Sequence, residues 1–236
     1  VIAGAIGGWA WGMIPALLRN WFGASEILVS LMLVYVAQRI AAWMAFGPMK
    51  NPEGFGMPGS RNLQQYPAAS NPELIAGTGI HWGVVAAVVA VFATWFLMSR
   101  HIRGFRIRVA GLAPRAARFA GVRPETLVAF CLGLSGALAG MAGLFEVAGP
   151  GGQITDSFGS GYGFTAIIVA FLGRLHPVGI LLAGLLMALT YIGGELAQLM
   201  LSLPAATVQV FQGMLLFFLL AFDTLTRYRL RWGTAR

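Results

Sequence analysis

Charged residues are scarce in this chain of 236 residues. Asp, Glu, Lys and Arg together make up 10 % of the sequence, whereas hydrophobic residues make up 58 %. A soluble domain carries about 25 % charged residues and uses them to cover its surface. The shortage therefore excludes an ordinary soluble fold. Apolar runs recur along the chain, and most of them reach the roughly 20 residues that a bilayer crossing needs.

The residue types on which catalysis and metal binding depend are also rare. Cys131 is the single cysteine, so it forms no disulfide within the chain and no cysteine metal site. The histidines, His81, His101 and His176, are scattered at the edges of apolar runs. No G-x-x-x-x-G-K-[ST] motif is present, and Lys50 is the only lysine, so the chain has no P-loop for ATP. We therefore predict no catalytic residue, no metal site and no ATPase site.

The apolar runs predict an all-α fold, a polytopic transmembrane helical bundle that forms one domain over residues 1–236. The long helices are predicted at residues 1–18, 27–46, 80–99, 125–148, 178–197 and 205–222. Residues 162–173 are apolar too, but about 12 residues fall short of a full crossing. This segment could be a broken helix, a tilted helix or a complete crossing. Because the sequence begins inside an apolar run, we expect further helices before Val1.

Glycines mark faces on which membrane helices can approach closely. Gly4 and Gly8 form a small-xxx-small pair in the first run. The run at 125–148 carries four more glycines on related faces, at Gly133, Gly136, Gly140 and Gly143. Both runs are therefore candidates for close helix packing.

The basic residues predict the orientation of the bundle. The net charge is +8, and the segment between the third and fourth long runs holds seven arginines and no acidic residue. These are Arg100, Arg103, Arg106, Arg108, Arg115, Arg118 and Arg123. Loops rich in Lys and Arg stay in the cytoplasm, so we place residues 100–124 and the basic tail 223–236 there. The proline-rich loop 47–79 is then external, and we expect little regular structure in it. This distribution favours a cell-membrane protein over a nucleic-acid-binding one.

The basic segment also contains the signals of a short helix. Pro114 suits the first position of a helix, and Gly121 suits its C-terminal cap. We predict a small amphipathic helix at residues 115–120 on the cytoplasmic face. From spacing alone, a basic loop that holds anionic lipid is an equal alternative.

The same segment resembles the coupling loop of ABC importer permeases of the branched-chain amino acid, ribose and nucleoside class. Their pattern is roughly G-x-x-x-R-A-x-G-x-N-x-x-A-A-x-x-x-G-I. The residues that match it here are Gly104, Arg108, Gly111, Pro114, Ala116, Ala117 and Gly121. The resemblance implies that these residues, together with Arg118, dock into a groove of an ATPase subunit.

Three other segments carry the resemblance along the chain. Residues 22–30, FGASEILVS, are similar to F-G-x-N-E-V-I-x-T, and residues 161–173 are similar to G-Y-G-F-x-A-I-A-V-A-L-L-G. Residues 146–149 are similar to E-V-L-G. These details resemble the nucleoside and simple-sugar branch. Val34 departs from the pattern, because the family usually has Asn there.

The resemblance implies a permease subunit of an ATP-driven importer that forms a pathway for nucleosides or simple sugars. Its implied partners are a second permease subunit (the same chain or a different one), cytoplasmic ATP-binding subunits and an external substrate-binding protein. The chain itself would bind no cofactor, because ATP and Mg²⁺ would lie on the ATPase. The alternatives are a secondary transporter or channel, a branched-chain amino acid permease and a non-transporting scaffold.

Polar side chains within or beside the apolar runs are candidates for the substrate pathway. They are Tyr35, Glu146, Tyr162, Thr165 and Glu195. A charge such as that of Glu146 would cost several kcal/mol in lipid, so it should face protein or a cavity. Tyr162 and Thr165 suit a sugar or a base, by stacking and by hydroxyl hydrogen bonds. Structural hydrogen bonding is the alternative role for each.

Overall fold

The computed structural model describes residues 1–52, 59–66, 70–75, 77, 79–155, 159, 161–202 and 204–227. Helices dominate this part of the chain, as predicted. Four of the described helices are long and apolar enough to cross a membrane: α2 (Glu26–Phe46), α3 (Trp82–Arg100), α6 (Pro124–Ala148) and α8 (Pro177–Leu201). The chain divides into two compact units, Val1–Gly159 and Ser160–Arg236.

The first unit contains six helices among its described residues. Besides α2, α3 and α6 they are α1 (Ile2–Phe22), α4 (Ile102–Leu112) and α5 (Pro114–Phe119). The long helices begin and end within a few residues of their predicted positions. The short helix α4 was not predicted, because the sequence prediction placed no helix at residues 102–112.

A tight turn joins α1 to α2. Gly23 adopts a left-handed conformation with φ of 66° and donates its N–H to the carbonyl of Arg19 at 3.0 Å, which ends α1. The guanidinium of Arg19 also pairs with the carboxylate of Glu26 at the start of α2. Glu26 thus lies in the first turn of its helix, where a negative charge is favourable.

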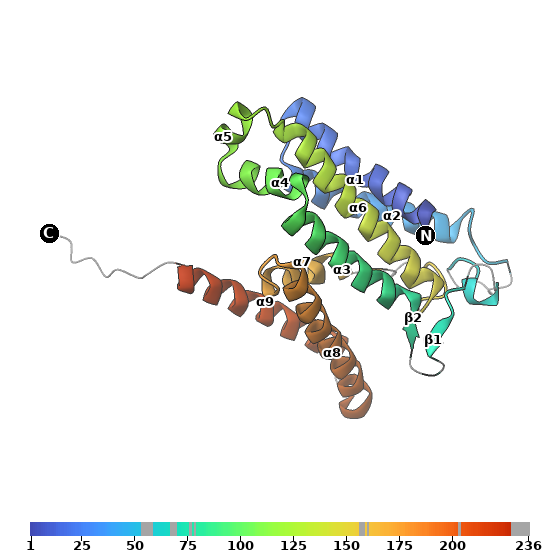
Figure 1. Cartoon of the computed structure of the whole chain (residues 1–236). Helices are drawn as coiled ribbons and strands as arrows, with labels where there is room; N and C mark the ends of the chain where they lie inside the picture. Colours follow the sequence, from blue (N-terminus) through green and yellow to red (C-terminus); the bar gives the residue numbers. More distant parts are fainter. Residues whose placement is uncertain are drawn as a thin grey trace. The chain divides into compact units, whose positions relative to one another are not determined.

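The packing of α1 against α6 brings two backbones together, and it is the most extensive helix contact in the unit (Figure 1). A Cβ atom on Gly4 would lie 2.8 Å from the carbonyl oxygen of Gly140. One on Gly8 would lie 2.9 Å from the Cα of Gly140, and one on Gly136 3.1 Å from the Cα of Gly12. Because only glycine fits at such distances, these five glycines define the interface, which we call the glycine seam. It confirms that both runs are sites of close packing.

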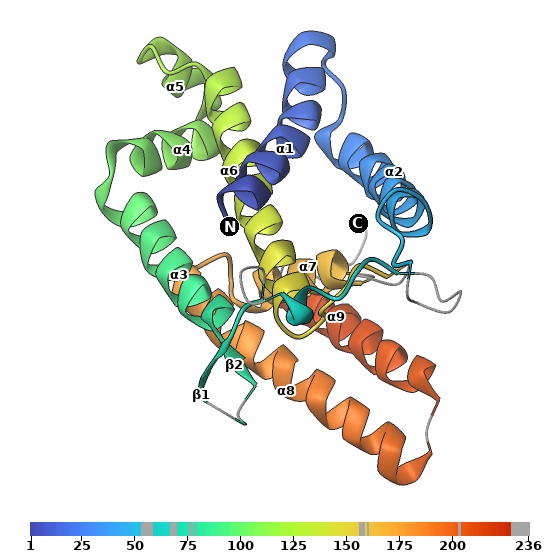
Figure 2. The same cartoon turned by 90° about the vertical axis from the view of Figure 1, so that its right-hand side faces the viewer.

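The loop between α2 and α3 has more regular structure than the sequence prediction allowed. It contains the 3₁₀ helix η1 (Leu63–Gln65) and an antiparallel pair of strands, β1 (Glu73–Ile75) and β2 (Ile80–His81). Figure 2 shows the strand pair at the start of α3. The N–H of Leu63 donates to Gly152 O at 2.7 Å, and that of Asn71 donates to Ala148 O at 2.8 Å. Backbone N–H groups of this loop thus find partners at the end of α6 and in the loop that follows it.

The second unit contains α7 (Tyr162–Leu172), α8 and α9 (Ala205–Arg227). With 11 residues, α7 rises about 16 Å, or roughly half of the hydrocarbon core, which favours the broken-helix alternative. It turns into α8 where Gly173 and Gly179 are in backbone contact. Of the predicted tail, residues 223–227 are the end of α9, and residues 228–236 lie outside the described residues.

Candidate functional site

Two short helices, α4 and α5, connect α3 to α6 at the ends of these spans (Figure 1). Pro114 occupies the first turn of α5, as predicted. Gly121 follows the helix with φ of 76° and donates its N–H to Arg118 O at 3.0 Å. The predicted coupling helix is therefore confirmed as an element within one residue of its expected bounds.

The sequence prediction missed α4. His101 caps this helix, because its Nδ1 accepts a hydrogen bond of 3.1 Å from the N–H of Arg103. Gly104 is buried, and a Cβ atom there would lie 2.7 Å from the Cα of Met98. The helical spacing of Ile102, Phe105 and Leu112 was the available signal. Three arginines in the same short run made the segment read as a loop instead.

The outer surface of α4 and α5 combines exposed apolar and basic side chains. Leu112 is 87 % exposed and Phe119 is 95 % exposed, and Arg108 is exposed beside them. A Cβ atom on Gly111 would meet nothing within 4 Å, whereas Ala117 is completely buried. Of the small residues in the predicted coupling set, Gly111 and Ala116 therefore offer room for another molecule, and Ala117 supports the helix from within.

Two contacts attach this surface to α6, and a third joins α1 to the start of the same helix. Arg118 of α5 lies 3.9 Å from the carboxylate of Glu125, at the start of α6. Asn20 of α1 donates its side-chain amide to the carbonyl of Glu125 at 3.1 Å. The guanidinium of Arg103 lies over the ring of Phe130, 5.2 Å from its centre. A force on α5 would thus reach α6 and, through the glycine seam, α1.

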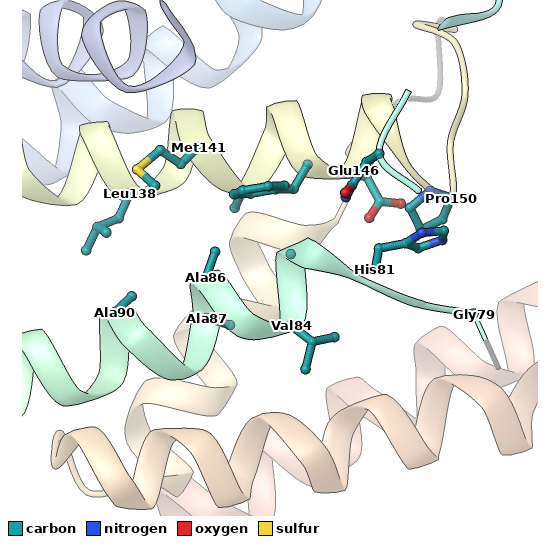
Figure 3. Close-up of a pocket in the computed structure, with 14 residues that line it drawn as sticks. Gly79, His81, Val84, Ala86, Ala87, Ala90, Leu138, Met141, Glu146 and Pro150 are labelled. Atoms are coloured by element: carbon teal, nitrogen blue, oxygen red, sulfur yellow. The ribbon is translucent and has the colours of Figure 1, made fainter. Parts of the chain in front are cut away.

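A hollow of about 470 Å³ lies between α3 and α6 at the end of these helices opposite α4 and α5. Figure 3 shows Leu138 and Met141 of α6 on one side of the hollow and Ala86 and Ala90 of α3 on the other. The remaining lining residues are Asn71, Gly79, His81, Gly83, Val84, Ala87, Ala142, Phe145, Glu146 and Pro150. The walls are therefore largely apolar.

The polar residues of the hollow gather at its loop end. The imidazole of His81 and the carboxylate of Glu146 lie near each other beside Pro150 (Figure 3). Asn71 reaches this end because its backbone is held by Ala148. Two buried atoms, Asn71 Nδ2 and His81 Nδ1, have no hydrogen-bond partner among the described residues. Sequence reasoning found Glu146 but missed Asn71, since nothing in a long polar loop indicates which residue folds back.

The structure does not bring Tyr35, the other predicted pathway residue of the first unit, to the hollow at Glu146. Tyr35 is exposed on α2 and forms a shallow groove with Arg39 and Trp43, on the same face of that helix. The hollow at Glu146 includes no residue of α2.

In the second unit, the predicted pathway residues Thr165 and Glu195 lie on one side of the α7–α8 pair, near Tyr191 of α8. The hydroxyl groups of Thr165 and Tyr191 are hydrogen-bonded at 2.6 Å. Glu195 is exposed one turn further along α8 than Tyr191. Tyr162 begins α7 and is exposed. The structural role that was the alternative for Thr165 is thus present, since its hydroxyl bridges two helices.

Comparisons with known proteins connect these features to one family. The chain is 36 % identical to a glucose ABC transporter permease protein of Haloferax volcanii, over 97 % of this chain and 62 % of the relative. It is 26 % identical to a guanosine ABC transporter permease protein of Bacillus subtilis, over 92 % of this chain and 63 % of the relative. A nucleoside ABC transporter permease protein of Lactococcus lactis subsp. cremoris is 26 % identical, over 93 % and 62 %. The chain thus spans about three fifths of the length of these relatives. No solved structure matches it.

The family assignment rests on most of the chain. A family model described as branched-chain amino acid transport system / permease component matches residues 1–220. Together with the four apolar helices, this match identifies a multi-pass membrane protein. The chain therefore belongs to the branched-chain amino acid transport system / permease component family.

Proposed function

We propose that this chain is a membrane-spanning permease subunit of an ATP-driven importer and that it forms part of a pathway for nucleosides or simple sugars. The observation that carries this proposal is the α4–α5 pair, which presents exposed arginines, Leu112 and Phe119 next to the open position at Gly111. The relatives include a glucose, a guanosine and a nucleoside ABC transporter permease, which supports the choice of solute.

The proposed partners follow from what the chain lacks and what it presents. It has no P-loop, so ATP hydrolysis is assigned to a separate cytoplasmic ATPase that grips α4 and α5. A second permease subunit completes the pathway, and an external binding protein delivers the solute near the loop between α2 and α3. The arginines of α4 and α5 support a cytoplasmic position for this side, because Lys and Arg concentrate in cytoplasmic loops. ATP-driven closure of the ATPase pair would then tilt the spans between outward-open and inward-open states.

The test of this proposal is a pair of substitutions on the exposed surface of α4 and α5. Gly111→Trp and Ala116→Trp fill space that a partner would occupy, but neither position is packed within the chain. We expect both variants to insert into the membrane normally and to lose at least tenfold in co-purification with the ATPase subunit. Gly7→Trp, at another open position, is the matched control and should retain the ATPase. Normal co-purification of both coupling variants would contradict the proposal.

Uptake by reconstituted vesicles tests the energy source and the solute. We expect uptake of nucleoside or hexose only when the ATPase and ATP are present. Leucine is tested as a third solute in the same vesicles, because the family description names branched-chain amino acids. Uptake without any ATPase would instead identify a secondary transporter or channel.

A further inference from the structure

We propose that the hollow between α3 and α6 is a binding site for the ring of a cyclic polyol, either the ribose of a nucleoside or the pyranose of a simple sugar. The ring hydroxyls would lie at the end formed by Asn71, His81 and Glu146, and the rest of the solute would lie along the apolar walls. This inference rests on the proposed function, because it assigns a place to the proposed solute.

The polar end offers the three kinds of group that hydroxyls bind best. The carboxylate of Glu146 accepts hydrogen bonds only, and its two oxygens can hold two neighbouring hydroxyls. The amide of Asn71 both donates and accepts, and the imidazole of His81 offers two ring nitrogens for hydrogen bonds. Adjacent hydroxyls, each a donor and an acceptor, complement this mixture. A hydrocarbon ligand would give no hydrogen bond to Asn71 Nδ2 or His81 Nδ1.

The two unpartnered atoms also favour a polar occupant. Asn71 Nδ2 and His81 Nδ1 are buried and have no partner among the described residues. A buried polar group left in this condition is unfavourable, because it has lost its hydrogen bonds to water. A small rotation of either side chain toward the hollow would let a ring hydroxyl supply the missing hydrogen bond. A ring hydroxyl that bonds to these two atoms would therefore be favoured over an apolar group at the same place.

The apolar walls provide a slot of suitable size. The α3 side is built from small residues, Gly83, Ala86 and Ala90, which recur at helical spacing on one face. The α6 side presents the larger Met141 and Phe145. A volume of about 470 Å³ lies within the range of roughly 300–1,000 Å³ found for small-molecule sites. The slot can take the C–H face of a hexose, and it also has room for the base that a ribose carries.

The position of the hollow suits a solute that arrives from outside. Its polar end lies beside the strand pair and the loop after α6, at the opposite end of the spans from α4 and α5. In the proposed orientation this end faces the external binding protein. The site would then be the first that the solute meets within this chain.

The experiment measures ATP-dependent uptake by the complete transporter in proteoliposomes. Labelled guanosine, 2′-deoxyguanosine, glucose and 2-deoxyglucose are compared in the wild type and in Glu146→Gln. We expect the wild type to prefer one parent ring to its deoxy analogue by at least tenfold in kcat/KM, because a hydrogen-bonding site rejects an analogue that lacks the hydroxyl. In Glu146→Gln this preference should fall to within about threefold. The parent ring that is imported identifies the source of the polyol.

A second variant tests the slot without touching the polar end. Ala86→Leu fills the hollow and should raise KM at least tenfold. Ala93→Leu is the matched control, because Ala93 is exposed on the same helix and does not line the hollow. Its KM should equal that of the wild type.

The outcomes separate this inference from the proposed function. Uptake by the wild type, with an unchanged preference in Glu146→Gln and an unchanged KM in Ala86→Leu, overturns the inference alone. Absence of ATP-dependent uptake of any of the four solutes by the wild type overturns the proposed function, and the inference with it. Loss of assembled transporter in Glu146→Gln, with the preference intact in the remainder, assigns Glu146 a structural role and overturns its role in binding.

Discussion

Helix α6 packs against α1 and α3 in opposite ways. Against α1 it brings backbone to backbone along the glycine seam, where most of the facing positions have no side chain. Against α3 it leaves a hollow of about 470 Å³ lined by alanines and by larger side chains of its own. In a membrane, where lipid is as apolar as any side chain, close packing is what holds helices together. The comparison teaches that α1 and α6 leave no space between their backbones, whereas α3 leaves open space beside α6.

The largest effect is expected from a substitution in the close contact between α1 and α6. A leucine in place of Gly8 would drive its side chain into the backbone of Gly136 and Gly140. Overpacking usually costs about 1–3 kcal/mol, and here backbone rather than side chain must move, so we expect Gly8→Leu to lower the free energy of unfolding by about 3 kcal/mol or more. Denaturant titration in detergent micelles measures the change. Gly7→Leu, where no atom lies within 4 Å, should unfold like the wild type.

A smaller effect is expected where α4 leaves α3. Gly104→Leu places atoms against the backbone of Leu97 and Met98, so it should push α4 away from its span at a cost of about 2 kcal/mol. The arginines of the segment then become accessible, and trypsin should cleave between residues 100 and 123 at least fivefold faster. Gly111→Leu in the same helix meets open space and is the control. Equal cleavage of both variants would mean that α4 does not depend on this contact.

The ion pair at the start of α6 should contribute less to the free energy of unfolding than the two glycine contacts. Arg118 and Glu125 are 69 % and 54 % exposed in their side chains and 3.9 Å apart, and exposed pairs contribute about 0–1 kcal/mol. Arg118→Gln should therefore change stability by less than 1 kcal/mol, and the difference should vanish in high salt. Unfolding at low and high ionic strength measures both. A larger, salt-independent loss would show that α5, and not only the glycine seam, determines how α6 is held.

The sequence predicted the glycine seam between α1 and α6 better than the hollow between α3 and α6. Gly4, Gly8, Gly136 and Gly140 are visible as a repeat, because a membrane helix with glycine at every fourth position has few other uses for it. The hollow has no such signature. Its polar end joins a loop residue, a strand residue and the last turn of a helix, which tertiary hydrogen bonds such as that from Asn71 to Ala148 bring together.

The coupling segment shows the same limit of local signals. Pro114 and Gly121 mark the ends of α5 by their own backbone preferences, so that helix was predictable. Residues 102–112 carry arginines on several faces, and their helix depends on contacts with α3 that the spacing does not reveal.

The smallest expected effect tests whether the α3 side is truly open. Ala86→Leu adds three carbon atoms to a helix face that borders the hollow, and the space there can receive them without displacing backbone. We expect the free energy of unfolding to change by no more than about 0.5 kcal/mol, as for a substitution that meets no packed neighbour. The same denaturant titration as for Gly8→Leu measures this change. A leucine in α1 and a leucine in α3 are thus compared, and both helices contact α6. A loss comparable to that of Gly8→Leu would mean that α3 packs against α6 as closely as α1 does, because only a filled interface resists an added side chain. The hollow would then have no room for a solute, and binding would have to be sought elsewhere, with the groove at Tyr35 and Arg39 the next place to examine.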